Sequence, residues 1–166
     1  MITIISGTNR PGSMSLKTAV IYYNKLRAAG ENVSVLSLEG KQVWERAASM
    51  VATEAEFLIP AEKFIFILPE YNASFPGIVK SMMDNSDIKK CWWYKKAMLV
   101  GISDGRAGNL RGIEHMTSIL HYLKINVLYN KVLLSTIKDE ISQEGVLLKP
   151  ATEALIDQQI ENLIKF

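Results

Sequence analysis

The sequence contains a single cysteine, Cys91, so no disulfide can form within the chain. A reducing, cytoplasmic compartment is therefore expected. No histidine–carboxylate pair lies near Cys91 in the sequence, and we expect no catalytic thiol. The two histidines, His115 and His121, stand about 240° apart on an expected helix, so they cannot share a metal ion and no metal site is predicted.

Long apolar runs and a strong charge of either sign are also missing. No run approaches the roughly 20 residues needed to cross a bilayer, and the first residues lack the basic stretch of a signal peptide. The formal net charge is only +2. Nucleic acids and acidic membranes usually require a concentrated basic face, so neither is predicted as a partner.

One short segment mixes basic and aromatic residues, as nucleic-acid-binding sites do. It is Lys89-Lys90-Cys91-Trp92-Trp93-Tyr94-Lys95-Lys96. Because the segment stands alone, we interpret it as a loop whose tryptophans pack under the next strand or against a partner subunit. A wall of a ligand cleft is the alternative.

Short apolar runs alternate with segments of helical period along the chain. The runs predict strands at residues 2–6, 32–38, 63–68, 97–102 and 127–129, the last with 132–134 as a possible extension. Helices are predicted at 15–29, from Pro76 to about Asp87, and in the amphipathic stretch that carries Ile113, Met116, Leu120 and Leu123.

Two further helical patterns are less regular or lie at the end of the chain. Residues 41–60 are predicted to form a helical face with Trp44, Ala47, Ala48 and Val51, ending at Pro60. The last helix, 150–165, is expected to bury Leu155, Ile156, Ile160, Leu163 and Ile164.

About five alternations of strand and helix predict an α/β fold with an open parallel sheet and helices on both faces. The length of 166 residues fits one domain. In such sheets ligands bind beyond the carboxyl ends of the strands, where the strand order reverses. The loops after the first, third and fourth strands are therefore the candidate site.

The first of these loops reads Ser6-Gly7-Thr8-Asn9-Arg10-Pro11-Gly12-Ser13-Met14-Ser15 and precedes a helix, whose free amides favour an anion. Thr8, Ser13 and Ser15 add hydroxyl groups, and Arg10 adds a planar fork suited to phosphate. Ser13 stands where a P-loop has lysine, and the G-x-G-x-x-G pattern is missing. The loop favours a single terminal phosphate; a turn that merely caps the helix is the alternative.

The loop after the third strand reads Leu68-Pro69-Glu70-Tyr71-Asn72-Ala73-Ser74-Phe75-Pro76-Gly77-Ile78-Val79-Lys80. It resembles the NADPH-dependent FMN reductase family, whose members carry P-E-Y-N-x-S-x-P-G-x-x-K at this place. The first loop is similar to the same family's G-S-x-R-x-x-S pattern, with Thr8 in place of the serine. A rigid turn that caps the next helix is what the residues alone would also allow.

The resemblance implies a flavodoxin-like three-layer sandwich with a five-stranded parallel sheet in the order 2-1-3-4-5, and residues 1–166 as a single FMN-binding domain. It implies FMN as cofactor, with the first loop on the phosphate. Pro69, Glu70, Tyr71 and Asn72 would cradle the flavin ring, with the backbone amides of this loop facing it. For Glu70, an acid–base role competes with a salt bridge or a subunit contact.

The loop after the fourth strand, Ser103-Asp104-Gly105-Arg106-Ala107-Gly108, is again rich in glycine and precedes a helix. The resemblance implies that it borders the pyrimidine end of the flavin. The family commonly has a Gly-Gly pair where this chain has Arg106-Ala107. Arg106 would place positive charge near a reduced, anionic flavin; a solvated loop is the alternative.

With the resemblance, the sequence predicts an oxidoreductase that takes hydride from NADPH or NADH onto FMN and passes it to a small acceptor. The resemblance suggests a flavin, a quinone or an azo compound as that acceptor. The resemblance also implies a homodimer or homotetramer. The alternative is a flavodoxin-like electron carrier, or a module that binds FMN or phosphate without turnover. The slightly basic charge argues against a carrier with an acidic docking surface.

Overall fold

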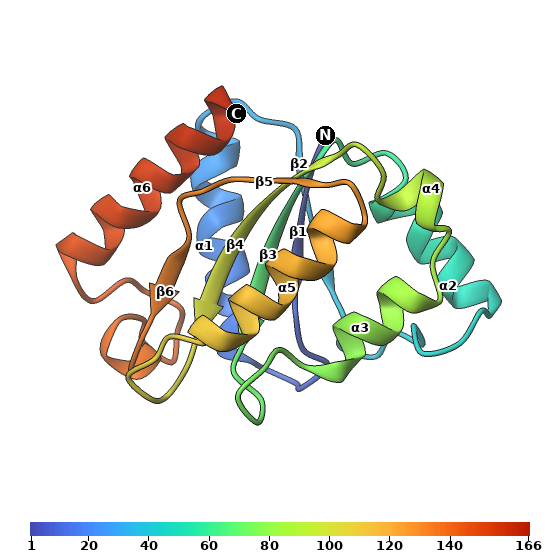
Figure 1. Ribbon diagram of the computed structural model, residues 1–166. Coiled ribbons are helices and arrows are strands. Elements are labelled where there is room, and N and C mark those ends of the chain that lie inside the picture. The colour runs from blue at the N-terminus through green and yellow to red at the C-terminus, as the bar shows by residue number, and fades with distance from the viewer.

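The centre of the molecule is a parallel sheet, seen in a computed structural model that describes all 166 residues (Figure 1). Its long strands are β1 (Ile2–Ser6), β2 (Val33–Ser37), β3 (Lys63–Pro69) and β4 (Lys96–Ile102). The strand order is β2-β1-β3-β4-β5, as predicted. β3 and β4 are almost wholly buried because helices cover both of their faces.

The fifth strand is split into β5 (Asn126–Val127) and β6 (Val132–Leu134), and both parts pair with β4. The buried amide of Gln159 fills the gap between them. Its Nε2 donates to the Leu99 carbonyl of β4 at 3.1 Å and to the Asn130 carbonyl at 2.8 Å. The Leu128 amide still donates to the Ala97 carbonyl of β4, so the chain leaves the sheet at residues 129–131, and Gln159 satisfies the Leu99 carbonyl that this part of the chain leaves free.

The helices form a layer on each face of the sheet (Figure 1). One layer consists of α1 (Met14–Ala28) and α6 (Pro150–Lys165). The other consists of α2 (Ala48–Thr53), the π-helical η1 (Glu54–Leu58), α3 (Gly77–Asp84), α4 (Ile88–Cys91) and α5 (Leu110–Tyr122). A short 3-10 turn, η2 (Ile137–Asp139), follows β6.

Three details of the helices differ from the sequence predictions. Pro76 is the N-cap residue of α3 instead of a first-turn residue, and α3 ends at Asp84. In α6, Ile156, Ile160 and Leu163 are buried as expected, but Leu155 and Ile164 are exposed. These two residues lie outside the stripe that faces the sheet, so their burial was predicted wrongly.

The segment 41–60 was also predicted with the wrong buried face. Trp44 and Val51 are 52% and 48% exposed, and Ala47 is only the N-cap residue of α2. Met50 and Leu58 are buried instead. The reason is that α2 begins only at Ala48, so residues 41–47 are not helical and a helical period does not apply to Trp44. After Thr53 the π-helical η1 changes the residue spacing again.

A buried carboxylate anchors this segment to its neighbours. Glu54 accepts hydrogen bonds from the guanidinium of Arg46 and from the backbone amide of Asp87. Burial by itself would raise the pKa of Glu54, but these hydrogen bonds and the charge of Arg46 hold it below its usual range. The ionised carboxylate therefore joins η1 to the start of α4.

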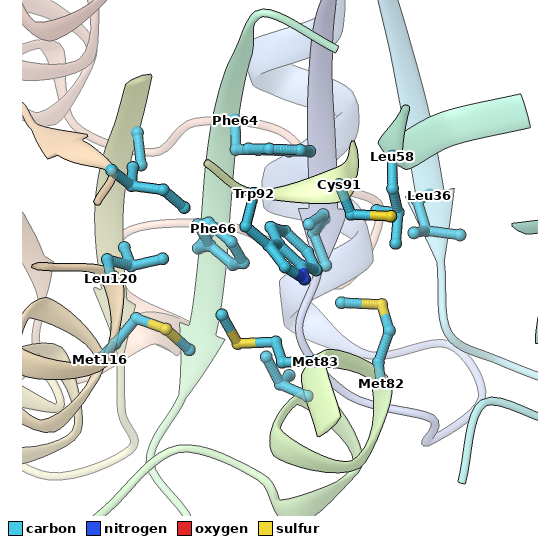
Figure 2. Packing of buried hydrophobic residues seen from close by; sticks show 14 of the residues in the cluster. Leu36, Leu58, Phe64, Phe66, Met82, Met83, Cys91, Trp92, Met116 and Leu120 are labelled. Atoms are coloured by element: carbon cyan, nitrogen blue, oxygen red, sulfur yellow. The ribbon is translucent and has the colours of Figure 1, made fainter. Parts of the chain in front are cut away.

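Trp92 and Trp93, the tryptophans of the basic and aromatic segment, lie away from the carboxyl ends of the strands. Figure 2 shows Trp92 packed among the core residues, and its ring centroid is 5.0 Å from that of Phe64. Trp93 is half-buried beneath Lys124, whose Nζ is 3.8 Å from its ring centroid. Residues 89–95 precede β4 and Lys96 is its first residue, so the segment lies at the amino end of the sheet. None of these residues lines the cavity at the opposite edge.

Candidate functional site

A cavity of about 260 Å³ lies at the carboxyl edge of the sheet, where the loops after β1, β3 and β4 meet. β1 stands between β2 and β3, so the strand order reverses beside it, and this is where open α/β sheets bind ligands. The cavity is lined by Thr8, Arg10, Pro11, Ser13, Met14, Ser15, Pro69, Glu70, Tyr71, Ile102, Ser103, Asp104 and Ile137.

Most of the site residues predicted from the sequence line this one cavity. The exceptions are Gly7, Asn72, Gly105 and Arg106, which lie close by in the chain but outside the lining. Pro11, Ile102 and Ile137 line the cavity and were not predicted. Ile137 follows β6, so no pattern in the three loops would have indicated it.

The first loop begins with a close backbone contact at Gly7. The Gly7 amide donates to the Ile67 carbonyl of β3 at 2.9 Å. A Cβ atom at this position would lie 2.8 Å from that oxygen and 2.7 Å from Leu68 Cδ2. Gly7 is therefore required for the close contact with the end of β3. It supports the cavity indirectly, because this contact fixes where the first loop begins.

The start of α1 supplies the anion-binding character of the cavity. Ser13 is the N-cap residue, and its hydroxyl accepts from the Leu16 amide at 3.2 Å. Met14 and Ser15 are the first two helical residues, whose amides have no partner within a helix. Both residues line the cavity. The helix dipole and these amides favour a negatively charged group at this end.

Tyr71 joins the first loop to the third. Its hydroxyl is hydrogen-bonded to the buried Thr8 Oγ1 at 2.7 Å. The Arg10 guanidinium lies over the same ring, with Cζ 4.2 Å from the centroid. Tyr71 is thereby held at both its edge and its face, so this wall of the cavity is fixed by side chains of the opposite loop.

The third loop makes a tight turn after β3. Tyr71 and Ser74 exchange two backbone hydrogen bonds, of 2.8 Å and 3.1 Å. Asn72 and Ala73 between them both have positive φ, of 51° and 62°, as a type I′ turn requires. The turn directs Asn72 to solvent, which explains why it does not line the cavity.

The backbone amides of this loop are partly used within the protein. Glu70 donates its amide to the Ile102 carbonyl of β4 at 2.8 Å, and Tyr71 donates to Ser74. The amides of Asn72 and Ala73 take part in no backbone hydrogen bond. A planar ligand held by amides of this loop would therefore contact these two rather than those of Glu70 and Tyr71.

The fourth loop is ordered by its own serine. Ser103 Oγ donates to the Gly105 carbonyl at 2.8 Å and accepts from the Gly108 amide at 2.9 Å. Arg106 is exposed, and its carbonyl accepts from Ser135 Oγ at 2.7 Å. The loop therefore holds its shape without the side chain of Arg106, which points to no partner within the chain.

Asn109 is a structural residue of the site that the sequence analysis missed. It is fully buried with a φ of 63°, and its Nδ2 donates to the Leu68 carbonyl at the end of β3, at 3.0 Å. The bond ties the fourth loop to the third. The Gly108-Asn109 pair before a helix could have indicated it, because asparagine tolerates a left-handed backbone.

The cavity carries mixed charge, with Arg10 on one side and Glu70 and Asp104 on the other. No group of three or more His, Cys, Asp or Glu side chains is arranged to hold a metal ion. Burial and the negative charge of Glu54 raise the pKa of Cys91 to about 12, so this thiol is part of the core. No helix is long and apolar enough to cross a membrane.

Comparison with known proteins gives a family match over most of the chain. Residues 1–139 match the model of the NADPH-dependent FMN reductase family. An NAD(P)H-dependent FMN reductase of Pseudomonas aeruginosa is 30% identical over 106 residues, which are 62% of this chain and 57% of that protein. An NADH-dependent flavin reductase subunit of Lactobacillus johnsonii is 35% identical over 118 residues, 64% of this chain and 62% of that subunit. The matches thus span less than two thirds of both relatives.

A solved structure shows the same fold over nearly the whole chain. It is FerB, a flavoenzyme NAD(P)H:(acceptor) oxidoreductase from Paracoccus denitrificans, with a TM-score of 0.78. The match covers 99% of this chain and 94% of that one, at 16% identity. A flavodoxin of Pseudomonas aeruginosa matches 98% of both chains with a TM-score of 0.65, also at 16% identity. At these identities the likenesses show the fold, which is flavodoxin-like.

Gly101 provides a direct test of how closely the fourth loop packs. A Cβ atom there would lie 2.1 Å from the Gly108 carbonyl oxygen. Gly101→Ala is expected to destabilise the protein by about 1–3 kcal/mol or more, because the loop must move off β4. Urea unfolding measures this. Gly105→Ala is the control, since nothing lies within 4 Å of its Cβ position; equal stability of the two variants would contradict the packing.

Proposed function

Because this chain belongs to the NADPH-dependent FMN reductase family, we propose that it binds FMN at the carboxyl edge of its sheet and uses NADPH or NADH to reduce a small acceptor. A flavin, a quinone or an azo compound is the proposed acceptor class. The observation that carries the proposal is the convergence of three loops, two of which bear the family's motifs, on one cavity at the start of α1.

The residues of the cavity fit the phosphate end of FMN. Its walls carry the first-turn residues Met14 and Ser15, the hydroxyls of Ser13 and Ser15, and the fork of Arg10. These are the donors that a phosphate dianion requires. We propose that this part of the cavity holds the phosphate. Gly7 supports it by packing closely against β3, and Thr8 supports it through its hydrogen bond to Tyr71.

The remaining walls suit a flat ring. We propose that Pro69, Glu70, Tyr71 and Asn72 border the flavin on one side, and that Ser103, Asp104, Gly105 and Arg106 border its far edge. Arg106 stands where the family commonly has the first glycine of a Gly-Gly pair. Because Arg106 lies outside the cavity lining, this larger side chain does not close the cavity. FMN itself supplies the hydride chemistry, so the protein needs no proton donor at the ring.

A cavity of about 260 Å³ is slightly smaller than the roughly 300–1,000 Å³ of typical small-molecule sites. We propose that it takes the phosphate end and part of the ring, which leaves the ring accessible to a nicotinamide or an acceptor. Residues 1–166 are proposed to act as one FMN-binding domain in the cytoplasm.

We also propose that the protein is a homodimer or homotetramer. A groove of about 540 Å³ between α3 and α5 is lined by Met83, Ile88, Ile119 and Leu123, with Tyr122 81% exposed at its side. Exposed apolar grooves commonly mark protein interfaces.

Sedimentation velocity is expected to give a multiple of the 18.6 kDa chain mass. In Tyr122→Asp, desolvation of the new charge should weaken the association if the groove is the interface. A wild-type protein that sediments as a monomer at all concentrations would contradict the oligomer.

Turnover distinguishes the reductase from the carrier or binding module. When the FMN-loaded protein is mixed anaerobically with NADPH or NADH, the visible absorbance of the oxidised flavin is expected to bleach, and to return when a quinone is added. Stopped-flow absorbance follows both steps. Bound FMN that does not bleach with either nucleotide would support the carrier or module instead.

Arg10 is the positively charged residue of the proposed phosphate site. Arg10→Ala is expected to weaken FMN binding by about 1.5–3 kcal/mol, the scale of a hydrogen bond to a charged group. The FMN affinity of Arg10→Lys should lie between those of the wild type and Arg10→Ala, because lysine keeps the positive charge but lacks the planar guanidinium. Fluorescence titration measures the affinity, with Arg27→Ala at the other end of α1 as the control. An unchanged affinity in Arg10→Ala would remove Arg10 from the phosphate site.

A further inference from the structure

The turn that carries Tyr71 is costly to form. Its two central residues, Asn72 and Ala73, both adopt left-handed backbone conformations, and neither is glycine. A side chain with a Cβ atom disfavours this conformation, asparagine less than alanine. The turn therefore needs contacts from the rest of the protein to keep this shape, and those contacts decide how well the wall of the cavity is formed before a ligand binds.

Two side chains at the start of α5 bracket the chain that forms this wall. Asn109 Nδ2 donates to the Leu68 carbonyl at 3.0 Å, just before the turn. His115 Nδ1 is hydrogen-bonded to Ser74 Oγ at 2.9 Å, at the end of the turn. The segment 68–74 is thus held to α5 at both of its ends, while Thr8 and Arg10 hold Tyr71 from the first loop.

His115 acts on Tyr71 through one intermediate residue. Ser74 bonds to His115 with its hydroxyl, and with its backbone amide and carbonyl it bonds to Tyr71. A hydroxyl can donate to a neutral imidazole nitrogen or accept from a protonated one, so the contact is available to both forms of the ring. His115 itself does not line the cavity.

We propose that His115 is a positioning residue of the flavin site: through Ser74 it holds the Tyr71–Ser74 turn in the shape that binds FMN. This inference rests on the proposed function for its ligand, but the positioning is a property of the protein alone. It gives α5 a part in the site that neither the loop motifs nor the cavity lining indicates.

The positioning is tested first in the FMN-free protein. Amide hydrogen exchange of Tyr71 and Ser74 reports the opening of the turn, because these amides bond across it. His115→Ala is expected to speed exchange at both amides, whereas His121→Ala should leave them unchanged. His121 is the matched control, an exposed histidine on the same helix. Unchanged exchange in His115→Ala would overturn the inference.

The consequence for the ligand is tested by FMN titration. His115→Ala is expected to raise the Kd for FMN by roughly two- to tenfold, the effect of one hydrogen bond. His115→Asn should restore much of the affinity. The amide oxygen and nitrogen of asparagine are bonded to Cγ, as Nδ1 is in histidine, so one of them can reach Ser74 Oγ. Ser74→Ala should match His115→Ala, and the double variant should be no worse than either, because both remove the same contact.

The outcomes separate this inference from the function on which it rests. If the wild type binds FMN and His115→Ala binds it equally well, His115 does not position the turn for binding. If His115→Asn is no better than His115→Ala, the hydrogen bond is not the cause, and the inference is wrong. A wild type that binds no FMN overturns the proposed function, and with it the assignment of His115 to a flavin site.

Discussion

The packing of the fourth loop against the ends of β3 and β4 is the contact on which the site depends. Leu68 and Gly101 are partners in the β3–β4 register. The Gly108 carbonyl lies directly against Gly101, and Asn109 bonds to the Leu68 carbonyl. A side chain at Gly101 would occupy the space of the loop backbone. These two contacts fix the position of the fourth loop relative to β3 and β4. Because α5 follows this loop directly, they also fix where α5 begins.

From that position α5 reaches the third loop a second time, through His115 and Ser74. The third loop in turn meets the first through Tyr71, Thr8 and Arg10. Each of the three loops is therefore tied to another by contacts between residues of the protein itself, and these contacts do not depend on a ligand. A preformed site of this kind loses little conformational freedom on binding, and that favours affinity.

The two ends of the cavity differ in the groups that the backbone and the side chains present. The start of α1 offers amides and hydroxyls for a phosphate. In the proposed complex, the turn at Tyr71 and the fourth loop border the flavin ring. The cofactor of the proposed reaction carries the hydride, so the protein contributes binding, orientation and access rather than an acid or a base.

The sequence by itself determined the sheet, its order through the resemblance, and the three loops of the cavity. Continuous apolar runs such as 64–68 are the mark of central strands, and glycine-rich loops before helices are local signals. The tertiary structure alone decided which amides stay free, that Gln159 fills a split strand, and that Ile137 and His115 belong to the site or its support. These depend on residues far apart in the chain meeting in space, and a local pattern carries no information about such contacts.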